Sequence, residues 1–134
     1  MIGIIGLGYV GLPLVNATAR AGFRVTGFDI DPAKIDLLNR GRSYIDAVPG
    51  SAIDGHRRAG RFHATMDFAE IANCDVVVIC VPTPLTRQRE PDLSAVRKTA
   101  QSIAAALRKG QLIVLESTTY PGTTREVLVP ILEE

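Results

Sequence analysis

A glycine-rich hexapeptide follows the first apolar run of the chain. Residues 6–11 read GLGYVG and match the pattern GxGxxG, whose backbone amides can bind a phosphate where a helix begins. We expect Gly6 to permit a tight turn and Gly8 to let the backbone approach a pyrophosphate closely. Gly11 is expected to allow close contact between the helix and the strand. The hexapeptide therefore predicts a dinucleotide-binding loop.

The amides at the start of the following helix carry the expected phosphate contact. Those of Tyr9 and Val10 would lack partners within the helix and lie at the positive end of its dipole. A plain strand-to-helix turn without a ligand is the alternative interpretation. The context favours binding, because the hexapeptide joins a strand directly to a helix and the next strand ends in Asp29, about twenty residues on.

An acidic turn, residues 29–32, ends that second strand. Asp29 can accept hydrogen bonds from both hydroxyls of an adenosine ribose, and its charge would repel a 2′-phosphate, so we predict NAD rather than NADP. The other role for an acid here, capping the next helix, fits Asp31 better, because Asp31 directly precedes Pro32 at an expected first helical position. Lys34 is either a solvated lysine or a contact of the cofactor.

Elements of two periods alternate along the chain and must position these residues. Apolar runs of strand length alternate with helical patterns, which is typical of βαβ units and a parallel sheet. We expect strands at Ile2–Ile5, Phe23–Phe28, a short stretch near Phe62, Asp75–Val81 and Leu112–Leu115. We expect helices after the glycine cluster, after Asp31, within residues 42–60, after Asp92 and around Val127, the last kinked by Pro130. The pattern predicts an α/β fold: a single Rossmann-type domain, residues 1–134, with a doubly wound parallel sheet in three layers (α/β/α).

The helical patterns also predict which residues face the core. In the first helix the apolar residues at helical spacing are Val10, Leu14, Ala17 and Ala21. In the helix capped by Asp92 they are Leu93, Val96, Ala100, Ile103 and Leu107.

The composition is ordinary for a globular domain and excludes several functions. A formal net charge of +1 provides no basic excess for nucleic acid, and no apolar run is long enough for a membrane span. We therefore expect neither nucleic-acid nor membrane partners, and a cytoplasmic location. Cys74 and Cys80 are expected to be buried and reduced, because two cysteines are too few for a disulfide framework and both lie at one apolar run. The alternative, a nucleophilic Cys80, lacks a nearby histidine, lysine or helix N-terminus in the sequence that would lower its pKa. We predict no metal site.

Ordered motifs span the whole chain. They are GLGYVGLPL from Gly6, GFDID followed by Lys34, CVPTPL at residues 80–85 and ESTTYPGTT at residues 116–124. Together they resemble the N-terminal domain of the UDP-glucose/GDP-mannose dehydrogenase family. REPDL after CVPTPL, and YPGTT after EST, are similar to the branch that oxidises UDP-N-acetylhexosamines, such as UDP-N-acetylglucosamine and UDP-N-acetylmannosamine. A UDP-glucose 6-dehydrogenase is the alternative, although those enzymes more often carry a run like VPVGT where this chain has YPGTT.

The resemblance implies that both ends of the dinucleotide are held by residues of this chain. Asp29 and Lys34 would bind the adenosine ribose, and Val10 the pyrophosphate. Pro82 and Thr83 follow the fourth predicted strand and would lie beside the cofactor toward its nicotinamide end.

A threonine further along the chain, Thr118, matches the active-site threonine of the family, which contacts the cofactor and helps to order a water. Thr83 and Thr118 both follow predicted parallel strands, and ligands of open α/β sheets bind at the carboxyl ends of such strands. A proline-rigidified turn at Thr83 and a helix cap at Thr118 are the alternatives. Arg87 and Arg89 are expected to be solvated rather than to contact a nucleotide-sugar phosphate.

The chemistry that the resemblance implies needs further catalytic groups. Family members oxidise a primary alcohol to a carboxylate in two hydride transfers, with two NAD and a cysteine-bound intermediate, for polysaccharide precursor synthesis. The resemblance places their cysteine, lysine and asparagine in later domains, and implies a homo-oligomer. We therefore expect the N-terminal fragment of a UDP-sugar 6-dehydrogenase that binds NAD but does not turn over. The alternatives are a stand-alone NAD-sensing module, or another NAD enzyme such as a β-hydroxyacid dehydrogenase, which should lack VPTP and ESTTYPGTT.

Overall fold

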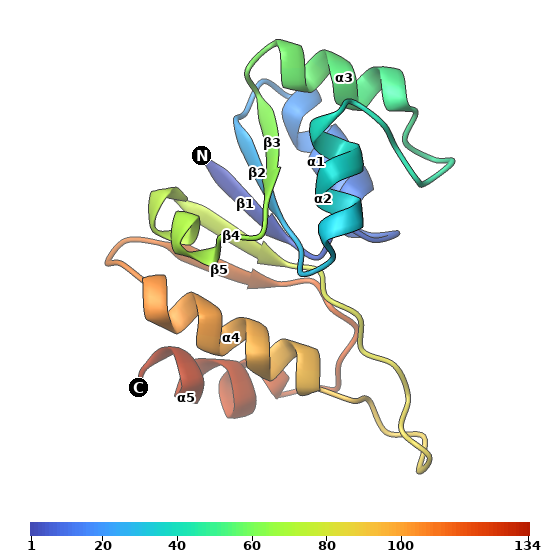
Figure 1. Ribbon diagram of the computed structural model, residues 1–134. Coiled ribbons are helices and arrows are strands. Elements are labelled where there is room, and N and C mark those ends of the chain that lie inside the picture. Colours follow the sequence, from blue (N-terminus) through green and yellow to red (C-terminus); the bar gives the residue numbers. More distant parts are fainter.

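A parallel sheet of five strands, in the order β3-β2-β1-β4-β5, forms the middle layer of the molecule (Figure 1). The computed structural model describes residues 1–134. The strands are β1 (Ile2–Ile5), β2 (Val25–Phe28), β3 (Phe62–Thr65), β4 (Val76–Ile79) and β5 (Leu112–Leu115). Because every neighbouring pair is parallel, all the carboxyl ends lie at one edge. The chain first builds outward from β1 to β3 and then returns to place β4 on the other side of β1.

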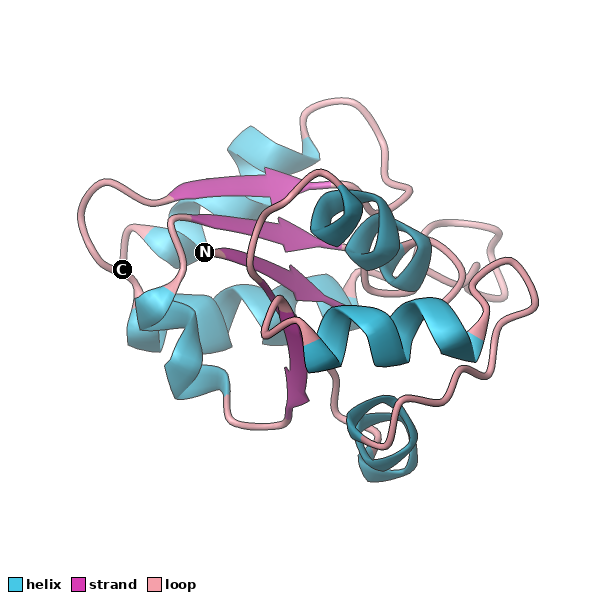
Figure 2. Cartoon of the chain, turned by 90° about the horizontal axis from the view of Figure 1, so that it is seen from above, coloured by secondary structure: helices cyan, strands magenta, loops and turns pink.

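Helices cover both faces of this sheet (Figures 1 and 2). One face carries α1 (Gly11–Arg20), α2 (Pro32–Asn39) and α3 (Gly50–Arg58), and the other carries α4 (Ser94–Ala106) and α5 (Val129–Leu132). Successive strand residues point to opposite faces. Ile4 accordingly packs with Leu12 of α1 in one core, and Ile5 with Ile103 of α4 in the other. The predicted three-layer Rossmann-type fold is confirmed.

The predicted strands agree with the structure apart from their ends. β1 and β5 have the predicted bounds, and β4 lies inside the predicted range. The second strand begins at Val25 rather than Phe23, because the Phe23 side chain is 55% exposed and lies outside the ladder with β1. A 3₁₀ helix at Phe68–Asn73, which leads from β3 toward β4, has no counterpart in the predicted elements.

The predicted buried face of the first helix is wrong for three of its four residues, whereas Leu14 is partly buried and packs against the core. The buried residues of α1 are Gly11, Leu12, Val15 and Ala19. Val10 is instead 58% exposed, and Ala17 and Ala21 are exposed as well. The helix begins at Gly11, which lies against the Gly6 carbonyl, and Leu12, Val15 and Ala19 pack into the core.

The predicted C-terminal helix around Val127 is present and is irregular in the turn before Pro130. A π-helical turn spans Thr124–Leu128 and leads directly into α5. Pro130 has no N–H to donate to the preceding turn, so regular α-helical pairing is interrupted there. No helix combines the length and apolar character needed to cross a bilayer.

Candidate functional site

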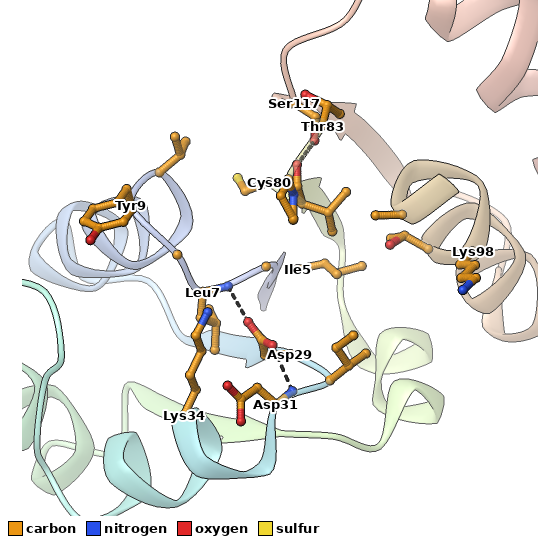
Figure 3. A pocket seen from close by; sticks show the side chains of 18 of the residues that line it. Ile5, Leu7, Tyr9, Asp29, Asp31, Lys34, Cys80, Thr83, Lys98 and Ser117 are labelled. Carbon is orange, nitrogen blue, oxygen red and sulfur yellow. Dashed lines mark hydrogen bonds between the residues drawn. The ribbon is translucent and has the colours of Figure 1, made fainter. Parts of the chain in front are cut away.

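A cleft of about 1240 Å³ opens at the carboxyl ends of the strands, beside the point between β1 and β4 where the strand order reverses. Ligands bind at this point in open α/β sheets. Figure 3 shows how side chains from several loops meet around it. The cleft is lined by the predicted site residues Gly6, Gly8, Tyr9, Val10, Asp29, Lys34, Pro82, Thr83 and Thr118. Of the predicted set, Gly11 alone does not line the cleft.

The three glycines of the hexapeptide have different structural roles. Gly6 has φ +92°, and a Cβ there would lie 2.6 Å from the carbonyl oxygen of Cys80. A Cβ at Gly11 would lie 1.7 Å from the Gly6 oxygen, so Gly11 permits helix and strand contact without touching the cleft. A Cβ at Gly8 would meet no protein atom within 4 Å. The fold therefore requires Gly6 and Gly11, whereas Gly8 keeps space open beside the cleft.

Backbone amides at the mouth of the cleft have no acceptor within the protein. Leu12 donates to the Gly8 oxygen at 3.1 Å, and Leu14 to the Val10 oxygen at 3.2 Å. The amides of Gly8, Tyr9 and Val10 donate to nothing. Because helix dipoles add positive potential at this end, these amides suit an anion such as a diphosphate.

The Asp29 carboxylate is held by two backbone amides. Its Oδ2 accepts from Leu7 at 2.9 Å, and its Oδ1 accepts from Asp31 at 3.0 Å (Figure 3). A carboxylate oxygen has a second lone pair, so both oxygens can still accept from ribose hydroxyls. Asp31, as predicted, caps α2 by accepting from Ala33 at 2.9 Å, with Pro32 at the start of the helix.

Tyr44, on the segment between α2 and α3, is a residue of the cleft that sequence reasoning missed. Its hydroxyl donates to the carbonyl oxygen of Leu7, and Lys34 Nζ lies 5.6 Å from the centre of its ring. Burial, and then the negative charges of Asp29 and Asp31, raise the pKa of Tyr44, so the hydroxyl remains a donor at neutral pH. An isolated tyrosine in an irregular segment carries no signal that would have revealed this contact.

The loops after β4 and β5 are joined by a serine that was also missed. Ser117 Oγ donates to the carbonyl oxygen of Val81 at 2.9 Å (Figure 3). This bond brings the segment that carries Thr83 beside the segment that carries Thr118. Thr118 itself is exposed. The serine lies within the ESTTYPGTT motif, but its spacing does not indicate a bond to the β4 loop.

The two cysteines differ in their surroundings. Cys74 is buried as predicted, whereas Cys80 is only partly buried and lines the cleft, which corrects the prediction that both are buried. Burial, together with the nearby charge of Glu116, raises the pKa of Cys80 to about 11. The Cys80 thiol therefore remains protonated at neutral pH and is a poor nucleophile.

The opposite wall of the cleft comes from α4 and the end of β2. The N-cap of α4 is Leu93 rather than the predicted Asp92. Asp92, one residue earlier, accepts from the Ser94 amide at 2.9 Å, and hydrogen bonds from Ser94 lower the Asp92 pKa. Ile30, 80% exposed, and Ala95 add apolar surface to this wall. Sequence patterns did not reveal this wall because it depends on how α4 crosses the sheet.

The polar loop between β4 and α4 places its arginines outside the cleft. Arg87 and Arg89 are exposed, as expected, and Arg89 takes a positive φ of 60° in a tight turn. An isolated antiparallel bridge between Leu85 and Pro91 closes the base of this turn. Neither arginine lines the cleft.

Comparisons with known proteins agree over the whole chain. The profile of the "UDP-glucose/GDP-mannose dehydrogenase family, NAD binding domain" matches residues 1–134. The chain is 35% identical to a UDP-N-acetyl-D-glucosamine 6-dehydrogenase of Pseudomonas aeruginosa over 99% of its own length and 31% of that protein's. It is 38% identical to a UDP-N-acetyl-D-mannosamine dehydrogenase of Salmonella typhimurium over 94% of its length and 30% of that protein's.

A solved structure of a relative has the same fold as this chain. A ternary complex of GDP-mannose dehydrogenase from Pseudomonas aeruginosa superposes with a TM-score of 0.94 at 34% identity, covering 98% of this chain and 31% of that chain. The chain thus spans about a third of the length of the relatives it matches.

Proposed function

Since this chain belongs to the UDP-glucose/GDP-mannose dehydrogenase family, we propose that its cleft holds NAD along the glycine loop, in an enzyme that oxidises a UDP-N-acetylhexosamine to the uronic acid. The chain is an NAD-binding domain of the nucleotide-sugar 6-dehydrogenase type. The proposal extends to a longer, homo-oligomeric, cytoplasmic enzyme of polysaccharide precursor synthesis that consumes two NAD per substrate.

The observation that carries the proposal is the set of amides without acceptors at Gly8, Tyr9 and Val10. They lie at the mouth of a cleft with room for a dinucleotide, and the space beside Gly8 is open. We assign the pyrophosphate to these amides and the adenosine ribose to Asp29, with Lys34 at the cleft edge. The fixed charge of Asp29 supports NAD over NADP.

The nicotinamide end of the site is assigned to the loops after β4 and β5. When bound, NAD supplies the hydride acceptor of the reaction. Pro82 and Thr83 form one side of this end, and Thr118 is proposed to contact the cofactor and order a water. The Ser117 bond to Val81 holds the two loops together, which supports a shared role.

The substrate class rests on motifs and relatives rather than on the cleft. REPDL and YPGTT favour a UDP-N-acetylhexosamine, and the relatives named for UDP-N-acetyl-D-glucosamine and UDP-N-acetyl-D-mannosamine support it. UDP-glucose is the alternative substrate. GDP-mannose is included in the test because a GDP-mannose 6-dehydrogenase is among the relatives.

Calorimetry with NAD and NADP tests the cofactor assignment on this chain. We expect NAD to bind with Kd on the order of 0.1 to 1 mM, about −4 to −5.5 kcal/mol, and NADP to bind more weakly. Tighter binding of NADP would contradict the role of Asp29. Turnover of UDP-N-acetylhexosamines, UDP-glucose and GDP-mannose by an enzyme that contains this chain then tests the substrate, and a preference for UDP-glucose would refute the N-acetylhexosamine proposal.

A further inference from the structure

One residue of the glycine loop is held on both sides of its backbone. The Leu7 amide donates to Asp29 Oδ2 at 2.9 Å, and the Leu7 carbonyl oxygen accepts from the Tyr44 hydroxyl. The Leu7 side chain is itself fully buried in the core beneath α1. Asp29 and Tyr44 therefore fix the backbone at the first step into the loop.

The bond from Tyr44 determines how the next amide is aimed. The Leu7 carbonyl and the Gly8 amide belong to one trans peptide, in which C=O and N–H point in opposite directions. Because Tyr44 holds the carbonyl, the Gly8 N–H points away from Tyr44 and has no protein acceptor. Glycine permits many backbone angles, so the bond from Tyr44 restricts the orientation of the Leu7–Gly8 peptide beyond what the Leu7 amide and side chain already impose.

The segment that carries Tyr44 is well anchored. Ser43 Oγ donates to the Ile45 oxygen at 3.1 Å and accepts from the Ile45 amide at 3.2 Å. The side chains of Ile45 and Val48 are buried in the core on the α1 face. Tyr44 is therefore already ordered in the folded chain, and ligand binding loses little further conformational entropy at this side chain.

The ring of Tyr44 also contacts the lysine of the cleft. Lys34 Nζ lies 5.6 Å from the ring centre, within the range of a cation–π interaction. Lys34 has no carboxylate partner within ion-pair distance. Figure 3 shows its side chain extending from α2 toward Leu7.

Building on the NAD site proposed above, we propose that Tyr44 is a positioning residue for the dinucleotide. Its hydroxyl aims the Leu7–Gly8 peptide so that the amides of the loop meet the pyrophosphate, and its ring holds the Lys34 ammonium at the edge of the cleft. The segment between α2 and α3 thereby takes part in cofactor binding, although no glycine motif or strand end lies in it.

NMR titration of the ¹⁵N-labelled chain tests this role with ligands that do or do not carry the pyrophosphate. Tyr44→Phe keeps the ring and removes the hydroxyl, and we expect it to weaken NAD and ADP-ribose by about tenfold, the upper range for one hydrogen bond. Adenosine, which lacks phosphate, should bind the variant within twofold of wild type. The Gly8 amide resonance should shift or broaden in the variant. Tyr120→Phe removes a hydroxyl outside the cleft and serves as the control.

The outcomes separate this inference from the NAD site itself. If wild type binds NAD and Tyr44→Phe binds it equally well, Tyr44 has no positioning role and the NAD site stands. Equal weakening of adenosine and NAD indicates general loosening and also overturns the role. A wild-type chain that binds no NAD contradicts the site instead. Should Tyr44→Phe fail to fold, the hydroxyl proton of Tyr44 in the wild-type NAD complex must exchange slowly with water, and fast exchange refutes the inference.

Discussion

The backbone amide of Leu7 donates to Oδ2 of Asp29 at 2.9 Å, which joins the loop after β1 to the carboxyl end of β2. The same carboxylate thus orders the glycine loop and keeps lone pairs that, in the proposed NAD site, would accept from a ribose. The proposal therefore couples cofactor selectivity and loop stability through one side chain, and substitutions can separate the two.

Replacing Asp29 with asparagine keeps an acceptor for the Leu7 amide but removes the charge. We expect Asp29→Asn to weaken NAD by about tenfold and to narrow the preference over NADP, because a charged acceptor contributes about 1.5 to 3 kcal/mol to a hydrogen bond. Asp29→Ala should also lower the free energy of unfolding by about 1 to 3 kcal/mol, since the buried Leu7 amide loses its partner. Calorimetry and urea unfolding measure the two effects. Asp36→Asn, on the exposed pair with Arg40, is the control. Unchanged NAD affinity in Asp29→Asn would remove the ribose contact.

The glycines of the loop should separate binding from folding. Gly8→Ala places a Cβ in open space, so we expect unfolding free energy to change by less than about 1 kcal/mol while NAD affinity falls more than tenfold. Gly11→Ala should cost about 3 kcal/mol or more, because its Cβ would overlap the Gly6 oxygen. Thermal unfolding and calorimetry on both variants provide the comparison. A stable Gly8→Ala chain with wild-type NAD affinity would disprove the pyrophosphate assignment.

Cys80 is expected to react slowly despite facing the cleft. Its pKa of about 11 lies above the ordinary value of 9.0, so the thiolate is about a hundredfold scarcer at pH 8 than for a free cysteine. Labelling by iodoacetamide, followed by mass spectrometry, should be correspondingly slow and should slow further with NAD. The folded state binds this proton more tightly, so the contribution to stability is lost as pH rises from 9 toward 11. Rapid labelling at pH 8, unaffected by NAD, would contradict the placement of Cys80 in the cleft.

Acid should destabilise the packing of α1 against α3 through a buried histidine. His56 Nε2 donates to Asn16 Oδ1 at 2.8 Å, and burial, followed by the charges of Arg61 and Arg20, lowers the His56 pKa below 6.5. The unfolded chain therefore takes up this proton first, and stability present above pH 6.5 is lost as the pH falls below it. Urea unfolding between pH 5 and 8 should show this slope in wild type but not in His56→Gln. His63→Gln, which replaces an exposed histidine, should keep the dependence of the unfolding free energy on pH. If His63→Gln removed that dependence, it would have to be assigned to His63 instead of His56.

The local features of the site could be predicted because only a few residue types can occupy the positions concerned. The glycine spacing, the cap that Asp31 provides for α2, and the apolar run that became β4 could be predicted because turns, caps and buried strands each demand particular residues. The doubly wound parallel sheet followed from the alternation of strand and helix periods along the chain, whereas the strand order was seen only in the structure.

Other features depended on contacts between distant segments. The rotation of α1 escaped prediction because apolar residues lie on more than one of its faces, and the face that is buried depends on tertiary packing, including the close approach of Gly11 to the Gly6 carbonyl. Tyr44 and Ser117 join loops that are far apart in the sequence, and the wall from α4 exists only once that helix has crossed the sheet. The sequence by itself determined the kind of fold and the position of the glycine loop, because both depend on short-range patterns of residue types. The tertiary structure alone decided what holds that loop in position, because hydrogen bonds between distant segments leave no periodic trace in the sequence.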